Sequence, residues 1–169
     1  MRYLLLLCCL VLSNCLSVPD GVEPIQNFEL NRYLGRWYEV ARLDHSFERG
    51  LEAVTAEYSL RSDGGIRVIN SGRDTETAEI QQAEGRAYFV EDSNIGHLKV
   101  SFFGPFYGSY VIFELDQKDY QYAFVAGNTT DYLWLLARTP QVSEGVLSRF
   151  KQRASSLGFD TSELIFLKH

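Results

Sequence analysis

Alternation of apolar and polar residues through the middle of the chain constrains the fold more than any other feature. From Val54 to Leu60 every second side chain is apolar, which is typical of a strand with one buried face. The same inward phase continues in residues 66–70, 85–89 and 98–102, and turn residues separate these runs. The pattern therefore predicts antiparallel strands joined by turns.

Further strand-like runs lie at residues 37–43, 110–115, 120–126 and 132–138. Eight strands is the number that closes a small barrel, which leaves no exposed sheet edge and encloses space for one small ligand. We therefore predict an all-β fold, an eight-stranded up-and-down antiparallel β-barrel. A two-sheet sandwich is the competing architecture.

The period of the pattern changes near the C-terminus. Apolar residues from Val146 to Leu157 recur at helical spacing, after the N-cap residue type Ser143 and before Gly158. We predict one amphipathic helix whose apolar stripe packs on the outside of the barrel. Residues 164–167 then offer a short closing strand.

The N-terminus indicates export. Residues 4–12 form an uninterrupted apolar run, which is typical of a signal peptide and shorter than the roughly 20 residues of a membrane-spanning helix. Leu12-Ser13-Asn14-Cys15 resembles the bacterial lipobox, whose cysteine is acylated and becomes the N-terminus after cleavage. We predict a lipoprotein signal peptide at 1–14, lipidation at Cys15, and a lipid anchor and tether over 15–27.

Leu16 indicates the destination of the lipidated protein. An aspartate after the cysteine retains lipoproteins in the inner membrane of Gram-negative bacteria, and leucine is not that signal. We expect a protein anchored in the outer membrane and facing the periplasm. Asn14 departs from the Gly, Ala or Ser usual before the cysteine; the alternative is cleavage near Ser17, giving a soluble secreted or periplasmic protein. The net charge of -6 argues against nucleic acid as a partner.

Three motifs within the predicted barrel carry a family resemblance. Gly35-Arg36-Trp37 opens the first strand, Thr130-Asp131-Tyr132 precedes the last barrel strand, and Arg138 ends it. In order and spacing they resemble the lipocalin signature, and the chain is similar to bacterial outer-membrane lipoprotein lipocalins and to the apolipoprotein D branch. The lipocalin domain is assigned to residues 28–169. The resemblance implies that Trp37 closes the barrel floor and that Arg138 lies across its indole ring.

The resemblance also implies the ligand-binding residues, since related lipocalins line the cavity at positions matching Tyr58, Asn70, Phe102 and Trp134. Aromatic walls provide contact area, while Asn70 and the Tyr58 hydroxyl can bind a head group or carbonyl. Core packing is the alternative role for these four residues. Glu39 also falls on the inward phase, and because a buried carboxylate is costly unless paired, we expect it near a barrel end with a Tyr or Arg partner.

The expected ligand is a fatty acid or lysophospholipid. Each buried methylene contributes roughly 0.8 kcal/mol, so an acyl chain of about sixteen carbons provides on the order of 12 kcal/mol before ordering costs. The resemblance implies storage or transport of such lipids for maintenance of the bacterial envelope.

Two other classes of function stay open. A lipocalin-type enzyme is one, although the sequence shows no nucleophile elbow or metal-ligand spacing and we expect His45, His97 and His169 on the surface or in loops. We therefore predict no catalytic residue, cofactor or metal. The other is an envelope interaction protein whose barrel is filled by its own side chains. In that case residues 103–107, including Phe103, Phe106 and Tyr107, form a partner or homodimer patch, or else a hydrophobic lip around the cavity mouth.

Overall fold

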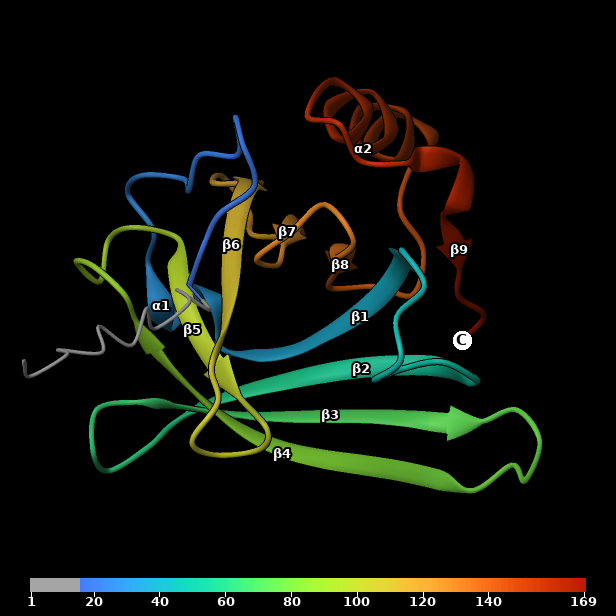
Figure 1. Ribbon diagram of the computed structural model, residues 1–169, viewed down its shortest axis with the longest axis horizontal. Helices are drawn as coiled ribbons and strands as arrows, with labels where there is room; N and C mark the ends of the chain where they lie inside the picture. Colours follow the sequence, from blue (N-terminus) through green and yellow to red (C-terminus); the bar gives the residue numbers. More distant parts are fainter. Residues whose placement is uncertain (1–15) are drawn as a thin grey trace, which may run out of the picture.

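Strands that follow one another in the sequence also lie side by side around a closed ring in the computed structural model, which describes residues 16–169 (Figure 1). The eight barrel strands are β1 (Gly35–Arg42), β2 (Leu51–Leu60), β3 (Ile66–Asp74), β4 (Ile80–Phe89), β5 (His97–Ser101), β6 (Gly108–Leu115), β7 (Tyr122–Ala126) and β8 (Leu133–Ala137). All neighbouring pairs are antiparallel.

β1 closes the barrel. Its first half pairs with β2, with Gly35 opposite Tyr58, and its second half pairs with β8, with Arg42 opposite Trp134. Each of the eight strands thus has two neighbours, which two separate sheets of a sandwich would not provide. The barrel prediction is confirmed.

The period-two pattern correctly gave the inward face. Residues of all eight strands contribute to one internal hydrophobic cluster, which includes Trp37, Val68, Ala87 and Leu98. Leu60 differs from the expectation, because it is the last residue of β2, beside the turn to β3, and is 58% exposed.

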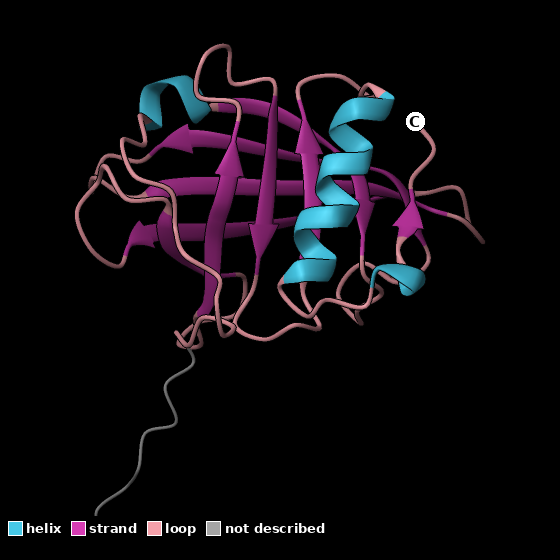
Figure 2. Ribbon diagram, turned by 90° about the horizontal axis from the view of Figure 1, so that it is seen from above, coloured by secondary structure: helices cyan, strands magenta, loops and turns pink. Residues whose placement is uncertain are grey.

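Helix α2 (Glu144–Ser156) lies against the outside of the barrel, as predicted (Figure 2). The Ser143 hydroxyl accepts a hydrogen bond from the Val146 N–H and caps its N-terminus. Phe150 is fully buried, with its ring 5.0 Å from that of Phe124 on the outer face of β7. The 3₁₀ turn η1 (Thr161–Glu163) and the short strand β9 (Ile165–Phe166) follow, and β9 pairs with the end of β1.

The two barrel ends differ. Helix α1 (Leu30–Tyr33) precedes β1 and covers the closed end. The loops after β1, β3, β5 and β7 all emerge at the opposite end, which we call the mouth. Before α1, Val22 is buried and the Ile25 N–H donates to the Ile112 carbonyl, so the second half of the predicted tether lies against the barrel.

The predicted signal peptide and Cys15 lie outside the described residues. Within residues 16–169, no helix is long and apolar enough to cross a membrane. This segment contains all nine strands, the internal hydrophobic cluster and an outer hydrophobic cluster that includes Phe124, Leu135 and Phe150, so it has the core of an independent folding unit.

Candidate functional site

A cavity of about 110 Å³ lies inside the barrel, between the closed end and the mouth. Most of its wall is apolar, with Ala56, Val68 and Ala87 contributed by neighbouring strands. The structure brings all four predicted ligand-binding residues to this cavity, which is lined by Tyr58, Asn70, Phe102 and Trp134 among others.

Three tyrosines form the inner end of the cavity. The Tyr110 hydroxyl lies 2.7 Å from that of Tyr33 and 2.8 Å from that of Tyr58, within hydrogen-bonding distance of both. Burial raises the pKa of all three phenols, so they stay neutral at physiological pH. The hydroxyls satisfy one another, and the Tyr58 ring lies 5.4 Å from that of Tyr33 and 6.2 Å from that of Tyr110.

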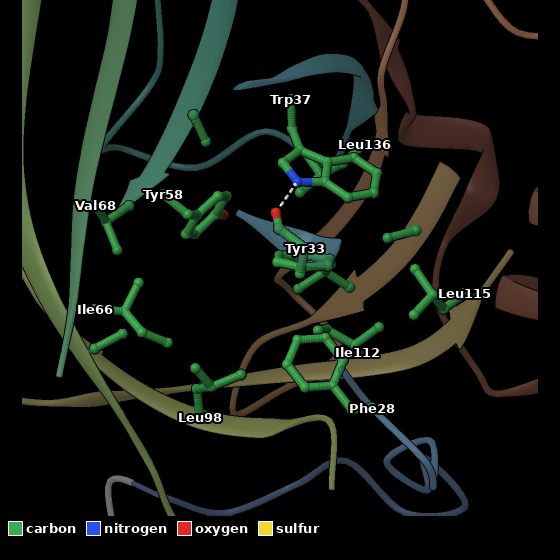
Figure 3. Close-up of a cluster of buried hydrophobic side chains, with 14 of the residues drawn as sticks. Phe28, Tyr33, Trp37, Tyr58, Ile66, Val68, Leu98, Ile112, Leu115 and Leu136 are labelled. Carbon is green, nitrogen blue, oxygen red and sulfur yellow. Dashed lines mark hydrogen bonds between the residues drawn. The ribbon is translucent and has the colours of Figure 1, made fainter. Parts of the chain in front are cut away.

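Trp37 and Arg138 seal the barrel floor beneath these tyrosines. The indole N–H of the fully buried Trp37 donates to the Tyr33 carbonyl at 2.8 Å, the dashed line in Figure 3. The Arg138 guanidinium lies 3.9 Å from the centre of the Trp37 ring, an arrangement that stabilises by about 0.5–2 kcal/mol. Gly35 beside them has a φ of +92°, which favours glycine.

Arg138 also holds the chain that leads into β1. Its guanidinium donates to four carbonyl oxygens, which belong to Arg32, Leu34, Arg36 and Tyr120. The first three lie at the end of α1 and the start of β1, where carbonyl groups lack helical partners. Of the remaining signature residues, Thr130 and Asp131 are exposed in the turn before β8, and Tyr132 stacks on Trp134 at 6.1 Å.

The middle of the cavity wall carries polar atoms without protein partners. The Asn70 Oδ1 and Ser109 Oγ atoms are buried and have no hydrogen-bond partner among the described residues. Phe102 packs its ring directly over Gly85, where an added Cβ would come within 2.8 Å of the ring. A glycine at position 85 is thus what allows Phe102 to lie flat against the wall.

A β-bulge shapes the mouth side of the cavity. The pairing register of β1 with β8 shifts between Glu39 and Ala41. Val40 and Ala41 therefore both belong to the outer hydrophobic cluster. Glu39 and Arg42, three residues apart in a strand, therefore reach the same side and form a buried ion pair at 2.9 Å. The expected Arg partner of Glu39 is confirmed, and Glu39 itself is only 3% exposed.

The loop after β1 folds back and brings Glu48 beside this ion pair. The Arg42 guanidinium donates to the Glu48 carbonyl at 2.7 Å, while Glu48 Oε2 lies 3.0 Å from His45 Nε2 and accepts from the Trp134 indole N–H at 3.2 Å. Burial and the neighbouring Glu48 raise the pKa of Glu39 well above its usual range. Burial also acts to raise the pKa of Glu48, but its bonds to His45 and Trp134 outweigh this and lower it.

Sequence reasoning missed several residues of the site. Tyr110 follows the alternating phase of its strand and could have been predicted, whereas Glu48 lies in a loop whose inward fold no periodicity predicts.

The expectation that the histidines lie on the surface or in loops is wrong for His97, which begins β5 and is 5% exposed. His45 is in a loop, as expected, but it is buried as well. No group of His, Cys, Asp and Glu side chains in residues 16–169 is arranged to hold a metal ion.

The comparisons with known proteins agree with this geometry. The model of the lipocalin-like domain family matches residues 28–169. The chain is a lipocalin. It is 60% identical to outer membrane lipoprotein Blc of Vibrio cholerae, over 97% of this chain and 96% of that protein. Outer membrane lipoprotein Blc of Escherichia coli K12 is 51% identical over 89% of this chain and 84% of its own length.

More distant lipocalins share the fold. Rat apolipoprotein D is 33% identical over 83% of this chain and 77% of its own length. The structure of insecticyanin from the tobacco hornworm matches with a TM-score of 0.72 at 20% identity, over 90% of this chain and 87% of that one. The Blc relatives confirm that this lipocalin is an outer membrane lipoprotein, as the sequence predicts.

Proposed function

We propose that this lipocalin binds a single-chain lipid, a fatty acid or a lysophospholipid, and stores or transports it for maintenance of the bacterial envelope. The observation that carries the proposal is the polarity of the cavity. Apart from Asn70 and Ser109 most of its wall is apolar, whereas Glu39, Glu48 and Trp134 lie at the mouth side. A tail along the wall with a head group at the mouth matches this distribution.

The cavity volume of about 110 Å³ is small for a whole acyl chain, since typical ligand pockets measure roughly 300–1,000 Å³. Phe102 and Trp134 are only half-buried and line its mouth side. We expect these two rings to move when a lipid enters, while the tyrosines at the closed end stay in place because their hydroxyls are bonded to one another.

We further propose that Cys15 carries the lipid anchor and that the barrel faces the periplasm. The names of the Blc relatives support this, as does the lipobox-like sequence. Metabolic labelling with palmitate tests it: label is expected on the wild type and absent from a Cys15→Ser variant. Label that persists in the variant would place the anchor elsewhere.

Blocking the cavity tests lipid binding. Soluble protein comprising residues 16–169 is stripped of lipid and titrated with lysophospholipid by calorimetry. Ala56→Phe places a ring in the cavity and is expected to abolish saturable binding; Ser59→Phe, on the exposed face of the same strand, is the control and should bind like the wild type. Unfolding curves are measured for each variant to check that it is folded. Equal binding by Ala56→Phe and wild type would exclude the cavity as the site.

The volume of about 110 Å³ also favours a second candidate, a barrel filled by its own side chains that acts through its surface. Phe103 and Phe106 are 69% and 72% exposed in the loop between β5 and β6, where a partner or second copy would contact them. Saturable lipid binding by the wild type decides against this candidate. An absence of binding, together with self-association that Phe106→Ser weakens, decides for it.

A further inference from the structure

The most exposed large apolar side chains of residues 16–169 all lie at the mouth of the barrel. Phe47, Ile80, Phe103 and Phe106 are 67–72% exposed and lie in or directly beside the loops after β1, β3 and β5. At the closed end the most exposed side chain of this kind is Leu60, at 58%. Exposed apolar side chains gathered at one end of a molecule mark a surface that contacts a partner or a membrane.

The N-terminal segment also begins at the mouth. The Ser17 hydroxyl donates to the Asn128 carbonyl in the β7–β8 loop at 3.0 Å. From there on the segment is held on the barrel, since Val18 packs against the outer hydrophobic cluster and Pro19 is buried. Two residues separate Ser17 from Cys15, and they span at most about 7 Å. A lipid on Cys15 therefore keeps the β7–β8 loop close to the membrane surface.

The strand order decides which of the apolar loops lie beside this attachment point. Because β6 pairs with β7 and β8 with β1, the β5–β6 and β1–β2 loops flank the β7–β8 loop. Phe47 of the β1–β2 loop stacks on Tyr132, just before β8, at 6.4 Å. The β3–β4 loop lies across the mouth and carries the exposed Glu76 and Glu79. The aromatic loops are thus beside the attachment point, and the acidic loop is opposite it.

Two cations lie behind the exposed rings of the β5–β6 loop. The Arg86 guanidinium is 5.8 Å and the Lys99 Nζ is 5.4 Å from the centre of the Tyr107 ring in this loop. Neither cation forms an ion pair within residues 16–169. Apolar side chains in front of basic ones suit the surface of an anionic bilayer, where phosphates lie outside the acyl chains.

A pocket of about 250 Å³ beside these cations suits a phosphate group. Its lining includes Arg61, Arg86, Ser101 and Gly104. Ser101 is 5% exposed, and its hydroxyl has no hydrogen-bond partner among the described residues. Guanidinium and hydroxyl groups both donate hydrogen bonds that phosphate oxygens accept. A phosphate in this pocket would therefore give the buried hydroxyl the partner that it lacks.

We propose, on the basis of the anchor at Cys15 proposed above, that the β5–β6, β7–β8 and β1–β2 loops dock on a phospholipid bilayer. Phe47, Phe103 and Phe106 enter the boundary between head groups and acyl chains. Arg86 and Ser101 bind the phosphate of an anionic phospholipid. The mouth then opens at the membrane surface, so a single-chain lipid passes between bilayer and cavity without crossing water.

Vesicle binding by the protein of residues 16–169 tests the docking surface, because this protein lacks Cys15 and its lipid. Sedimentation with vesicles of phosphatidylcholine and phosphatidylglycerol measures the affinity, and unfolding curves check that each variant is folded. Phe103→Ser combined with Phe106→Ser is expected to weaken binding at least about tenfold, since two rings no longer leave water. Leu60→Ser is the matched control at the closed end and should bind like the wild type.

Arg86→Gln tests the phosphate contact. It is expected to weaken binding to the vesicles with phosphatidylglycerol about fivefold and to change binding to pure phosphatidylcholine much less. Arg36→Gln is the control, because it removes the same charge from a side chain near the closed end that is 59% exposed. An equal loss in both variants would show that net charge alone acts, and would overturn the assignment of the phosphate to Arg86.

The outcomes separate this inference from the proposals on which it rests. If the wild type does not bind vesicles while lysophospholipid still saturates its cavity, docking is wrong and the lipid-binding function stands. Self-association that the double phenylalanine variant weakens, without vesicle binding, would assign the exposed rings to a second copy of the chain. A wild type that takes up no palmitate would refute the anchor, whatever the vesicles show.

Discussion

The closed end and the mouth of the barrel both bury polar groups, but they satisfy them differently. At the closed end Arg138 bonds four carbonyls and covers Trp37, and the three tyrosine hydroxyls bond one another. Toward the mouth, Glu39 pairs with Arg42 and Glu48 with His45, but the buried Asn70 Oδ1 and Ser109 Oγ atoms of the cavity wall have no partner among the described residues. Matched polar groups stabilise a fold, whereas mismatched ones cost free energy and are retained where a ligand uses them.

The largest expected effect is at the closed end. Trp37→Ala removes a fully buried ring under Arg138 and is expected to lower the free energy of unfolding by about 3–5 kcal/mol. Trp134→Ala, at the half-buried mouth position, should cost clearly less and impair lipid binding instead. Urea unfolding of both variants measures the difference. Equal losses of stability would remove the distinction between the two ends.

Arg138→Met tests the polar part of the seal. It leaves four carbonyl groups without their donor and is expected to cost about 2–3 kcal/mol. Arg36→Met is the control, since that side chain is 59% exposed and a surface change of this kind stays within about 0.5 kcal/mol. A loss no larger than that of the control would show that the carbonyls find water as an equal partner.

The mouth-side wall is tested by Gly85→Ala. The added Cβ would meet the Phe102 ring at 2.8 Å and the Ser101 carbonyl oxygen at 2.9 Å, so the ring and the neighbouring backbone must shift, at a cost of about 1–3 kcal/mol and with weaker lipid binding. At Gly108 a Cβ meets nothing within 4 Å, which makes Gly108→Ala the matched control. If Gly85→Ala binds lipid like the control, Phe102 does not shape the site.

The smallest expected effect is that of Glu39→Gln on stability. Because the folded-state pKa of Glu39 is raised, the wild type loses stability as pH rises from about 4.3, the usual value, toward the folded-state value. The lowered pKa of Glu48 acts the opposite way and only at lower pH. Unfolding measured across pH should show the decline above about pH 4.3 in the wild type and its absence in Glu39→Gln. A decline that persists in the variant would assign it to another group.

How far the sequence predicts the site depends on where each residue lies. Period-two alternation places Tyr58, Asn70 and Glu39 inside because their strand segments are regular. The bulge after Glu39 shifts that phase, so Arg42 faces the same side against simple alternation. Glu48 reaches the cavity from a loop, where backbone direction is set by contacts with Arg42 and His45 and not by a repeating pattern.

The central claim is that a lipid tail lies inside the barrel with its head group at the mouth, and intermolecular nuclear Overhauser effects measure this directly. With isotope-labelled lysophospholipid bound to residues 16–169, the tail methyl is expected to contact the Ala56 and Ala87 methyl groups and the head group to contact the Trp134 indole. Contacts restricted to the exposed rings of Phe103 and Phe106 would contradict the account, because they would place the lipid on the surface.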